Sequence, residues 1–139
     1  MQTSRKLAMA LTACAPLFAA GACAAADAAP RESAHPVFSQ ALPNAPGQRL
    51  TAVVVSYPPG GKSGKHRHAG SVFAYVLSGA IRSENSATGP ARVYKAGESF
   101  FEPPGSEHLV SENASETEPA SLLAIFVADD GAVLTKPVP

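Results

Sequence analysis

From Leu50 onward the chain is divided into short apolar segments by turns, and this spacing limits the folds that it can adopt. Turn sequences such as PPGGKSG, NSATGP and DDG separate six segments rich in β-branched and aromatic residues: LTAVVVSY, SVFAYVLSG, ARVYKAG, ESFFEPPG, EHLVSE and SLLAIFVAD. Short strands at regular intervals between Gly and Pro turns indicate an all-β sandwich or barrel. No long segment has the 3.6-residue periodicity of an amphipathic helix.

The first 26 residues have the pattern of a leader that is removed on export. Arg5 and Lys6 precede an uncharged, alanine-rich run that ends in Ala24-Ala25-Ala26, just before Asp27. A positive start, an apolar middle and an A-x-A end predict a secretory signal peptide over residues 1–26, cut after Ala26 within about three residues. We therefore expect a periplasmic or secreted protein whose mature domain does not enter the membrane.

Both cysteines lie within this leader. Cleavage after Ala26 removes Cys14 and Cys23, so the mature domain depends on its hydrophobic core and not on disulfides. The sequence around Cys14, LTAC, has the shape of a lipid-attachment box, and a lipoprotein is therefore the alternative. Cleavage also leaves 9 basic and 11 acidic residues, a net charge of −2. Nucleic acid is not an expected partner, because binding it requires a basic stripe.

The mature chain divides into an arm and a domain. Residues 27–49 are rich in Ala and Pro, with prolines at 30, 36, 43 and 46, which predicts a tail or linker that can also serve as an edge arm. Residues 50–139 contain all of the strand-like segments, so we expect them to form one β-barrel domain.

Three of the four histidines are placed to meet. His66 and His68 are two residues apart at the start of an apolar run, and alternate residues of a strand point to the same face. His108 follows the turn sequence Pro103-Pro104-Gly105, from which a returning strand can lie opposite the pair. Three neutral imidazoles suit one divalent transition metal ion, with Fe, Mn, Ni, Zn and Cu all left open. His35 lies outside this pattern, in the arm.

These residues resemble the two sequence motifs of the cupin superfamily, over about residues 50–129. Gly60, the pair His66 and His68, and Gly79 have the spacing of the first motif, in which Val72 stands where the family has Glu. Gly97, Pro103-Pro104-Gly105 and His108 have the spacing of the second motif, whose Asn position holds Glu112. The resemblance implies a double-stranded β-helix, or jelly-roll barrel, and it implies that His66, His68 and His108 are metal ligands.

The missing motif glutamate affects the expected chemistry. A divalent ion held by three histidines keeps a net charge of +2, which favours anionic substrates, and it has coordination positions free. Small cupins are often homodimers, although no interface can be identified in the sequence. The resemblance does not define an activity, because folds of this kind host many.

Glu102 is the candidate catalytic residue. It ends the segment ESFFE just before the Pro103 turn, and alternation places it on the same face as Phe100. Facing inward among apolar groups, it would have a raised pKa and would suit a general base or a fourth ligand. The simpler expectation is a solvent-facing Glu102 at the rim of the barrel.

Val72 is expected to point inward and Tyr75 away from the metal. Lys62, Lys65 and Arg67 are expected to be solvated or to steer an anion.

Two classes of function follow. The first is an exported mononuclear metalloenzyme acting on a small, anionic molecule. Its most specific form is a dioxygenase-type oxidoreductase, and isomerase or lyase chemistry are the alternatives. The second is a non-catalytic cupin module that binds a metal or ligand for storage, sensing or signalling. A convergent set of polar pocket residues would separate these classes, and the sequence offers only Glu102 for this purpose.

Overall fold

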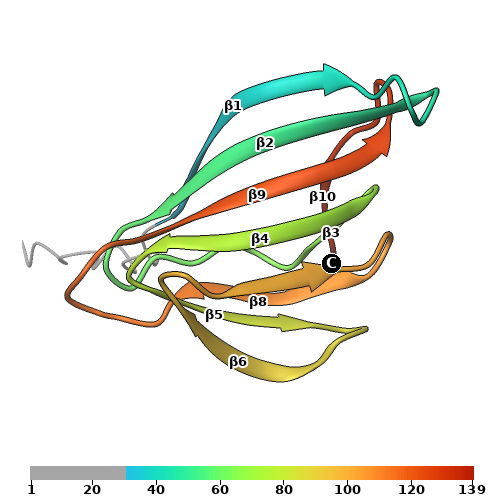
Figure 1. Cartoon of the computed structure of the whole chain (residues 1–139). Helices are drawn as coiled ribbons and strands as arrows, with labels where there is room; N and C mark the ends of the chain where they lie inside the picture. Colours follow the sequence, from blue (N-terminus) through green and yellow to red (C-terminus); the bar gives the residue numbers. More distant parts are fainter. Residues whose placement is uncertain (1–30) are drawn as a thin grey trace, which may run out of the picture.

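The computed structural model describes residues 31–139, and this part of the chain contains only β-strands, bridges and turns (Figure 1). The strands form two five-stranded sheets, in which all neighbouring strands are antiparallel. The prediction of an all-β jelly-roll fold is therefore confirmed. The predicted signal peptide and both cysteines lie outside the described residues. Within residues 31–139 there is no helix long and apolar enough to cross a membrane.

Each sheet combines strands that are distant in the sequence. The first sheet has the order β1 (Ser33–Ala41), β2 (Gln48–Tyr57), β9 (Ala120–Asp129), β4 (Ser71–Ser78) and β7 (Ser99–Glu102). The second sheet has the order β10 (Thr135–Pro137), β3 (His66–His68), β8 (Glu107–Asn113), β5 (Ala80–Asn85) and β6 (Gly89–Lys95). Consecutive strands such as β3 and β4 lie in different sheets, which is how the chain encloses a common interior.

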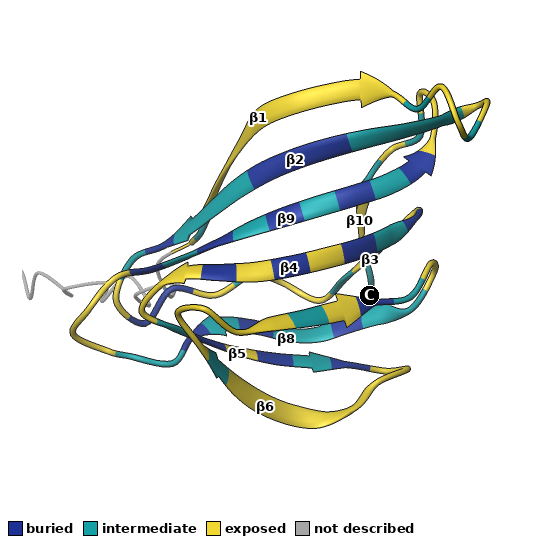
Figure 2. Cartoon of the chain, in the orientation of Figure 1, coloured by how far each residue is buried: buried dark blue, intermediate teal, exposed yellow. Residues whose placement is uncertain are grey.

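Alternation of apolar side chains builds this interior. Along β4, Val72 and Val76 are buried, whereas Phe73 and Tyr75 are exposed on the outer face, as the banding of β4 in Figure 2 shows. β9 alternates in the same way, and Leu122, Ala124 and Phe126 face inward. A period of two on neighbouring strands gives each sheet one apolar inner face, which the opposite sheet covers.

The histidine pair does not open the apolar strand, as its sequence position suggested. His66 and His68 form their own three-residue strand, β3, in the second sheet, whereas the apolar segment that follows is β4 of the first sheet. The chain changes sheet at Gly70, where a side chain would overlap the carbonyl oxygen of Val127 and the Cβ atom of Ala128. A glycine is thus required for the sharp corner that separates the two histidines from the core strand.

The segment predicted as an arm carries a strand. β1 lies within residues 27–49 and pairs with β2 from Ser33 to Ala41, with one irregularity between Pro36 and Phe38. It forms the edge of the first sheet, and every residue in it is exposed. Two further strands, β5 and β10, were not among the six segments that the sequence indicated. Both are short and polar, so their pairing depends on their neighbours more than on their own composition.

Candidate metal centre

β3 and β8 bring the three predicted histidines together. His66 and His108 are direct partners in the register of these antiparallel strands, and the centroids of their rings are 5.0 Å apart. His68 is on the same face as His66, with a centroid separation of 4.7 Å. One nitrogen from each of the three rings lies within 4.8 Å of the others. The alternation of side chains along a strand predicted that His66 and His68 share a face, and the return of the chain after Pro103 predicted that His108 lies opposite them. The structure agrees with both predictions.

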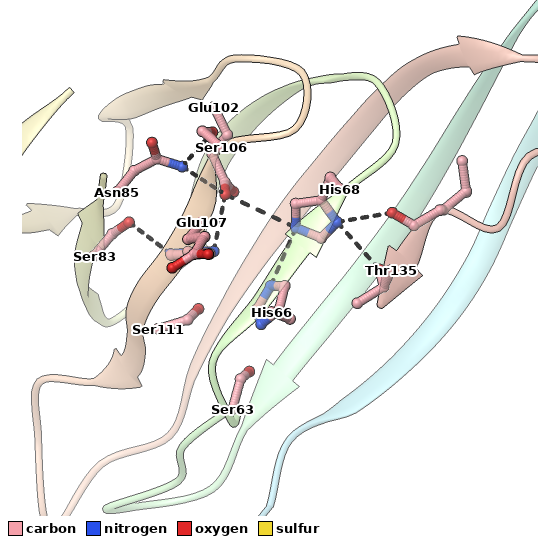
Figure 3. Close-up of polar contacts among 12 residues, drawn as sticks. Ser63, His66, His68, Ser83, Asn85, Glu102, Ser106, Glu107, Ser111 and Thr135 are labelled. Carbon is pink, nitrogen blue, oxygen red and sulfur yellow. Dashed lines mark hydrogen bonds and ion pairs between the residues drawn. The ribbon is translucent and has the colours of Figure 1, made fainter. Parts of the chain in front are cut away.

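Hydrogen bonds to backbone carbonyls orient the rings of β3. Nδ1 of His66 lies 2.7 Å from the carbonyl oxygen of Gly64, and Nδ1 of His68 lies 3.1 Å from that of Leu134. Because a carbonyl only accepts, each Nδ1 carries the hydrogen and each Nε2 keeps a free lone pair. Carbonyl partners of this kind fix the tautomer of metal-binding histidines. The two Nε2 atoms lie 3.1 Å apart, and a dashed line joins the two rings in Figure 3.

Two lone pairs at this separation repel unless a proton or a cation lies near both. Burial lowers the pKa values of His66 and His68 below the usual value for histidine, so a proton is disfavoured. Neutral imidazoles are also the form that binds metals. The donor set of three nitrogens therefore fits a divalent transition metal ion, which fulfils the chemical condition for the predicted cofactor without selecting one metal.

The structure places Glu102 inside the barrel, and the expected solvent-facing position is wrong. The side chain is 3% exposed, and its Oε2 lies 3.0 Å from Nδ1 of His108 and 3.8 Å from Nε2 of His68. Burial alone would raise the pKa of the Glu102 carboxyl. The hydrogen bond that His108 donates is the main opposing cause, and this pKa lies below its usual value. Glu102 is thus an ionised carboxylate, contrary to the raised pKa expected for an inward position.

The inner polar residues of β5 support this cluster and were missed in the sequence. Ser83 lies 2.8 Å from Nε2 of His108, and Asn85 donates to Oε2 of Glu102 at 3.3 Å and to Ser106 at 2.9 Å (Figure 3). Both Ser83 and Asn85 are buried and follow Ile81 at intervals of two. This alternation could have predicted that Ser83 and Asn85 face the interior, but the segment was not identified as a strand.

The C-terminal strand β10 also contributes to the site. The Oγ1 of Thr135 lies 3.2 Å from Nδ1 of His68, beside the carbonyl group of Leu134, and β10 pairs with β3 throughout. Nothing in the composition of this segment signalled that role. It follows from the sheet order, in which β10 covers the open edge of β3.

A cavity of about 560 Å³ opens beside the histidines. Its apolar walls come mainly from the first sheet, with Val53, Val55, Val72, Phe100, Leu122 and Phe126, whereas the second sheet contributes the histidines, Ser111 and Thr135. His66, His68, His108 and Glu102 all line it, together with Lys65 and Arg31, which are exposed. Charged exposed residues mark where the cavity meets solvent. The arrangement is that of a small-molecule site, a mainly apolar pocket with a few convergent polar groups.

Other predicted residues fall as follows. Val72 is buried at 1% exposure and Tyr75 points outward at 39%, as expected. Lys62 and Arg67 pair with acidic neighbours at the surface, the latter with Glu107 at 2.7 Å. These two cations are therefore partly neutralised, and only Lys65 of the predicted group lines the cavity.

Residues 53–126 match a family model described as cupin domain, and the chain belongs to this family. No curated protein matches. Among solved structures, a cupin domain of Bordetella pertussis is 22% identical with a TM-score of 0.56, covering 72% of this chain and 96% of its own. A DMSP lyase of Ruegeria pomeroyi is 22% identical with a TM-score of 0.55, covering 64% of this chain and 43% of its own.

A third similar structure is the oxalate decarboxylase of Bacillus subtilis, described as having Mn(II) centers. It is 28% identical with a TM-score of 0.54, and the match covers 64% of this chain and 24% of the enzyme. The chain thus spans less than half of the lyase and about a quarter of the decarboxylase. These similarities concern the fold, which includes metalloenzymes that act on small molecules.

Proposed function

We propose that this protein is an exported mononuclear metalloenzyme that oxidises a small organic anion with O₂, in the manner of a dioxygenase. The observation that carries the proposal is the pair of Nε2 lone pairs on His66 and His68, aimed at each other beside His108 and open to an apolar cavity. A bound ion would supply Lewis acidity and neighbouring coordination positions for a substrate and O₂. An apolar lining excludes water from such a centre and strengthens its electrostatic interactions.

The remaining polar groups define the substrate class. Lys65 and Arg31 are exposed cations among the residues that line the cavity, and they outnumber the half-buried Glu32 beside them, so they favour the approach of an anion. Phe100, Leu122 and Phe126 present apolar surface to the cavity, whose hydroxyl groups come from Tyr57, Ser63, Ser111 and Thr135, so we infer that the body of the substrate is mainly apolar. A small carboxylate, enolate or phenolate with a hydrocarbon portion has this combination of charge and surface.

Oxygen consumption by the metal-loaded protein tests this function. Substrates would be a panel of small carboxylates, enolates and phenolates, with His68→Ala as the inactive control. The proposal predicts substrate-dependent O₂ uptake, with both atoms of ¹⁸O₂ found in the product, and no uptake by the variant. Equal turnover under nitrogen would contradict it and would assign a redox-neutral cleavage, the reaction class of the lyase and the decarboxylase that share the fold.

The alternative is a non-catalytic module that binds a metal or a small ligand. It is favoured by the shortage of acid–base groups beside the histidines, since Glu102 is the one buried carboxylate among the described cavity residues. Tight metal and ligand binding without turnover, under air and under nitrogen, would support this alternative and contradict the enzyme.

We also propose that two copies associate through the outer face of the first sheet. The register aligns exposed Phe73, Tyr75 and Phe101 on β4 and β7 with exposed Phe38 on β1, across the outward side chains of β2 and β9. Along these described strands, the outward positions Ala52, Val54, Leu123, Ile125 and Val127 between them are uncharged. An apolar, uncharged face is complementary to itself, since it brings no like charges together in a symmetric pair.

The size of the face is adequate for a second copy. β2 and β9 have 10 residues each. Strands of that length run for roughly 33 Å, and five strands span roughly 19 Å between the outermost axes. The outline is therefore at most on the order of 600 Å², which is comparable with, though smaller than, the ~800 Å² per partner of a standard interface.

The molecular mass in solution tests this association. We expect a dimer by light scattering, a monomer for Phe73→Glu, and a dimer for the control Val93→Glu, which alters an equally exposed position on β6 of the other sheet. A monomeric natural protein at tens of micromolar would overturn the proposal. Monomers that bind phospholipid vesicles would likewise overturn it and would assign the face to a lipid surface.

A further inference from the structure

Glu102 stands directly across from the position where the family motif has its missing glutamate. Val72 on β4 and Glu102 on β7 are Cα partners in the antiparallel register, and both side chains are buried in the interior, at 1% and 3% exposure. Direct partners on one face have their Cβ atoms about 5 Å apart. A carboxylate moved from one position to the other across the strand pair therefore enters the same part of the cavity.

From this relationship we propose that Glu102 is the fourth ligand of the metal centre, so that the carboxylate is supplied by β7 instead of β4. The inference deepens the proposed function, on whose three-histidine centre it rests. It assigns Glu102 to the ion itself and not to proton transfer from a substrate.

The donor separations support this assignment. Around an ion with bonds of about 2.1 Å, neighbouring ligand atoms are roughly 3.0 Å apart at right angles and about 3.4 Å apart in a tetrahedron. Nε2 of His66 lies 3.1 Å from Nε2 of His68. Oε2 of Glu102 lies 3.0 Å from Nδ1 of His108, in a hydrogen bond whose proton would have to leave for both atoms to bind one ion. Oε2 is also 3.8 Å from Nε2 of His68, a separation that an open angle accommodates. The carboxylate oxygen thus lies within 4 Å of a nitrogen of His68 and of a nitrogen of His108.

The surroundings of Glu102 fit a ligand better than a base. Asn85 donates to the same Oε2 atom at 3.3 Å and to Ser106 at 2.9 Å, which holds the carboxylate in place. Hydrogen-bonded carboxylates of this kind are typical of metal sites, where outer partners orient the ligand. A carboxylate ligand also lowers the net charge of a divalent centre from +2 to about +1. The coordination positions left for an anionic substrate and O₂ become fewer by one.

Metal affinity and the spectrum of a bound cobalt ion test the proposal without reference to turnover. We expect Glu102→Gln and Glu102→Ala to weaken Co(II) and Zn(II) binding by more than about 100-fold, since loss of an outer partner alone costs 10- to 100-fold. The visible absorption of the Co(II) protein should also change. Glu107→Gln is the matched control, because Glu107 is a surface residue paired with Arg67, next to His108 in sequence, and it should leave both measurements unchanged.

Returning the carboxylate to β4 gives the sharpest test. The double variant Val72→Glu with Glu102→Val should recover affinity to within about 10-fold of the natural protein, because the two positions face the same space. If Glu102→Ala does not fold, metal affinity can still be measured in Glu102→Gln, because glutamine has nearly the same shape as glutamate and lacks only its charge. Unchanged affinity and an unchanged Co(II) spectrum for Glu102→Gln would overturn the inference, as would a folded double variant that does not recover binding. In both cases His68→Ala would still lose the metal if the proposed function holds, so the two failures are distinguishable.

Discussion

His66 and His108 are cross-strand partners on β3 and β8, with 41 residues between them in the chain and 5.0 Å between their ring centroids. The pairing depends on a β3 strand only three residues long, which is held on its other side by β10. The centre is therefore built by backbone pairing of a short strand, with the apolar interior as its support.

Removal of one histidine should abolish tight metal binding while the barrel remains folded. His68→Ala deletes one of the two facing Nε2 atoms, whereas Val76 and Ile81, which are fully buried and do not line the cavity, keep the core intact. Isothermal titration with Zn(II) and circular dichroism would measure both properties. His35→Ala serves as the control, because His35 is the fourth histidine and is exposed on β1. Equal affinity in His68→Ala and the natural protein would contradict the centre.

A side chain at Gly70 should destabilise the fold at the corner between the sheets. An added Cβ would overlap the carbonyl oxygen of Val127, which is backbone and cannot move aside. We expect Gly70→Ala to lower the free energy of unfolding by about 3 kcal/mol, at the upper end of overpacking costs. Gly64→Ala is the control on the other side of the histidine pair, since a Cβ there meets nothing within 4 Å. Similar denaturation midpoints for the two variants would show that the corner tolerates a side chain.

The stability of the protein should fall at alkaline pH because of Tyr57. Its hydroxyl is hydrogen-bonded to Ser111 at 2.7 Å and to Ser63 at 3.1 Å, and burial raises its pKa above 10.0. The unfolded chain loses this proton at about pH 10. The contribution of Tyr57 is thus complete below pH 10 and is lost as the pH rises toward the higher pKa of the folded state.

Urea denaturation between pH 8 and 11 would measure this effect. Tyr57→Phe should cost about 1 kcal/mol at pH 8, through the lost hydrogen bonds, and should make the alkaline loss shallower. Tyr75→Phe, at an exposed position, should change neither quantity. An identical pH profile for Tyr57→Phe and the natural protein would exclude the buried hydroxyl as the cause.

Export should remove the leader. Intact mass measurement of the protein from the periplasm or the culture medium should give a chain that begins at Asp27, within about three residues. An acylated chain beginning at Cys14 would establish the lipoprotein alternative instead. An uncleaved chain confined to the cytoplasm would contradict export altogether.

The segments that the sequence indicated as strands include β8, which carries His108, but not the three-residue β3, which carries His66 and His68. The faces of Val72 and Tyr75 were predictable, because the eight residues of β4 alternate without interruption. The inward position of Glu102 was not, since β7 has phenylalanines on both faces and only four residues. Phe101 is 49% exposed while Phe100 lines the cavity, so composition gave no sign of which face was the inner one.

The polar residues that hold the histidines and Glu102 in place could not be predicted from neighbouring sequence, for a different reason. Ser83 and Asn85 act through contacts with β8 and β7, and Leu134 and Thr135 act through the pairing of β10 with β3. Such contacts follow from sheet order, which the spacing of short strands leaves undetermined. The histidines were identifiable because their motif spacing already includes the return of the chain.

The metal content of the mature protein, purified from its own compartment without added metal, tests the central claim most directly. Elemental analysis by mass spectrometry should find about one transition metal ion per chain in the natural protein and almost none in His68→Ala. A redox-active ion, Fe, Mn, Ni or Cu, is the result expected for an oxygen-dependent enzyme. A metal-free protein that also takes up no ion on titration would contradict the account, because the facing lone pairs of His66 and His68 would then have no cation to join them.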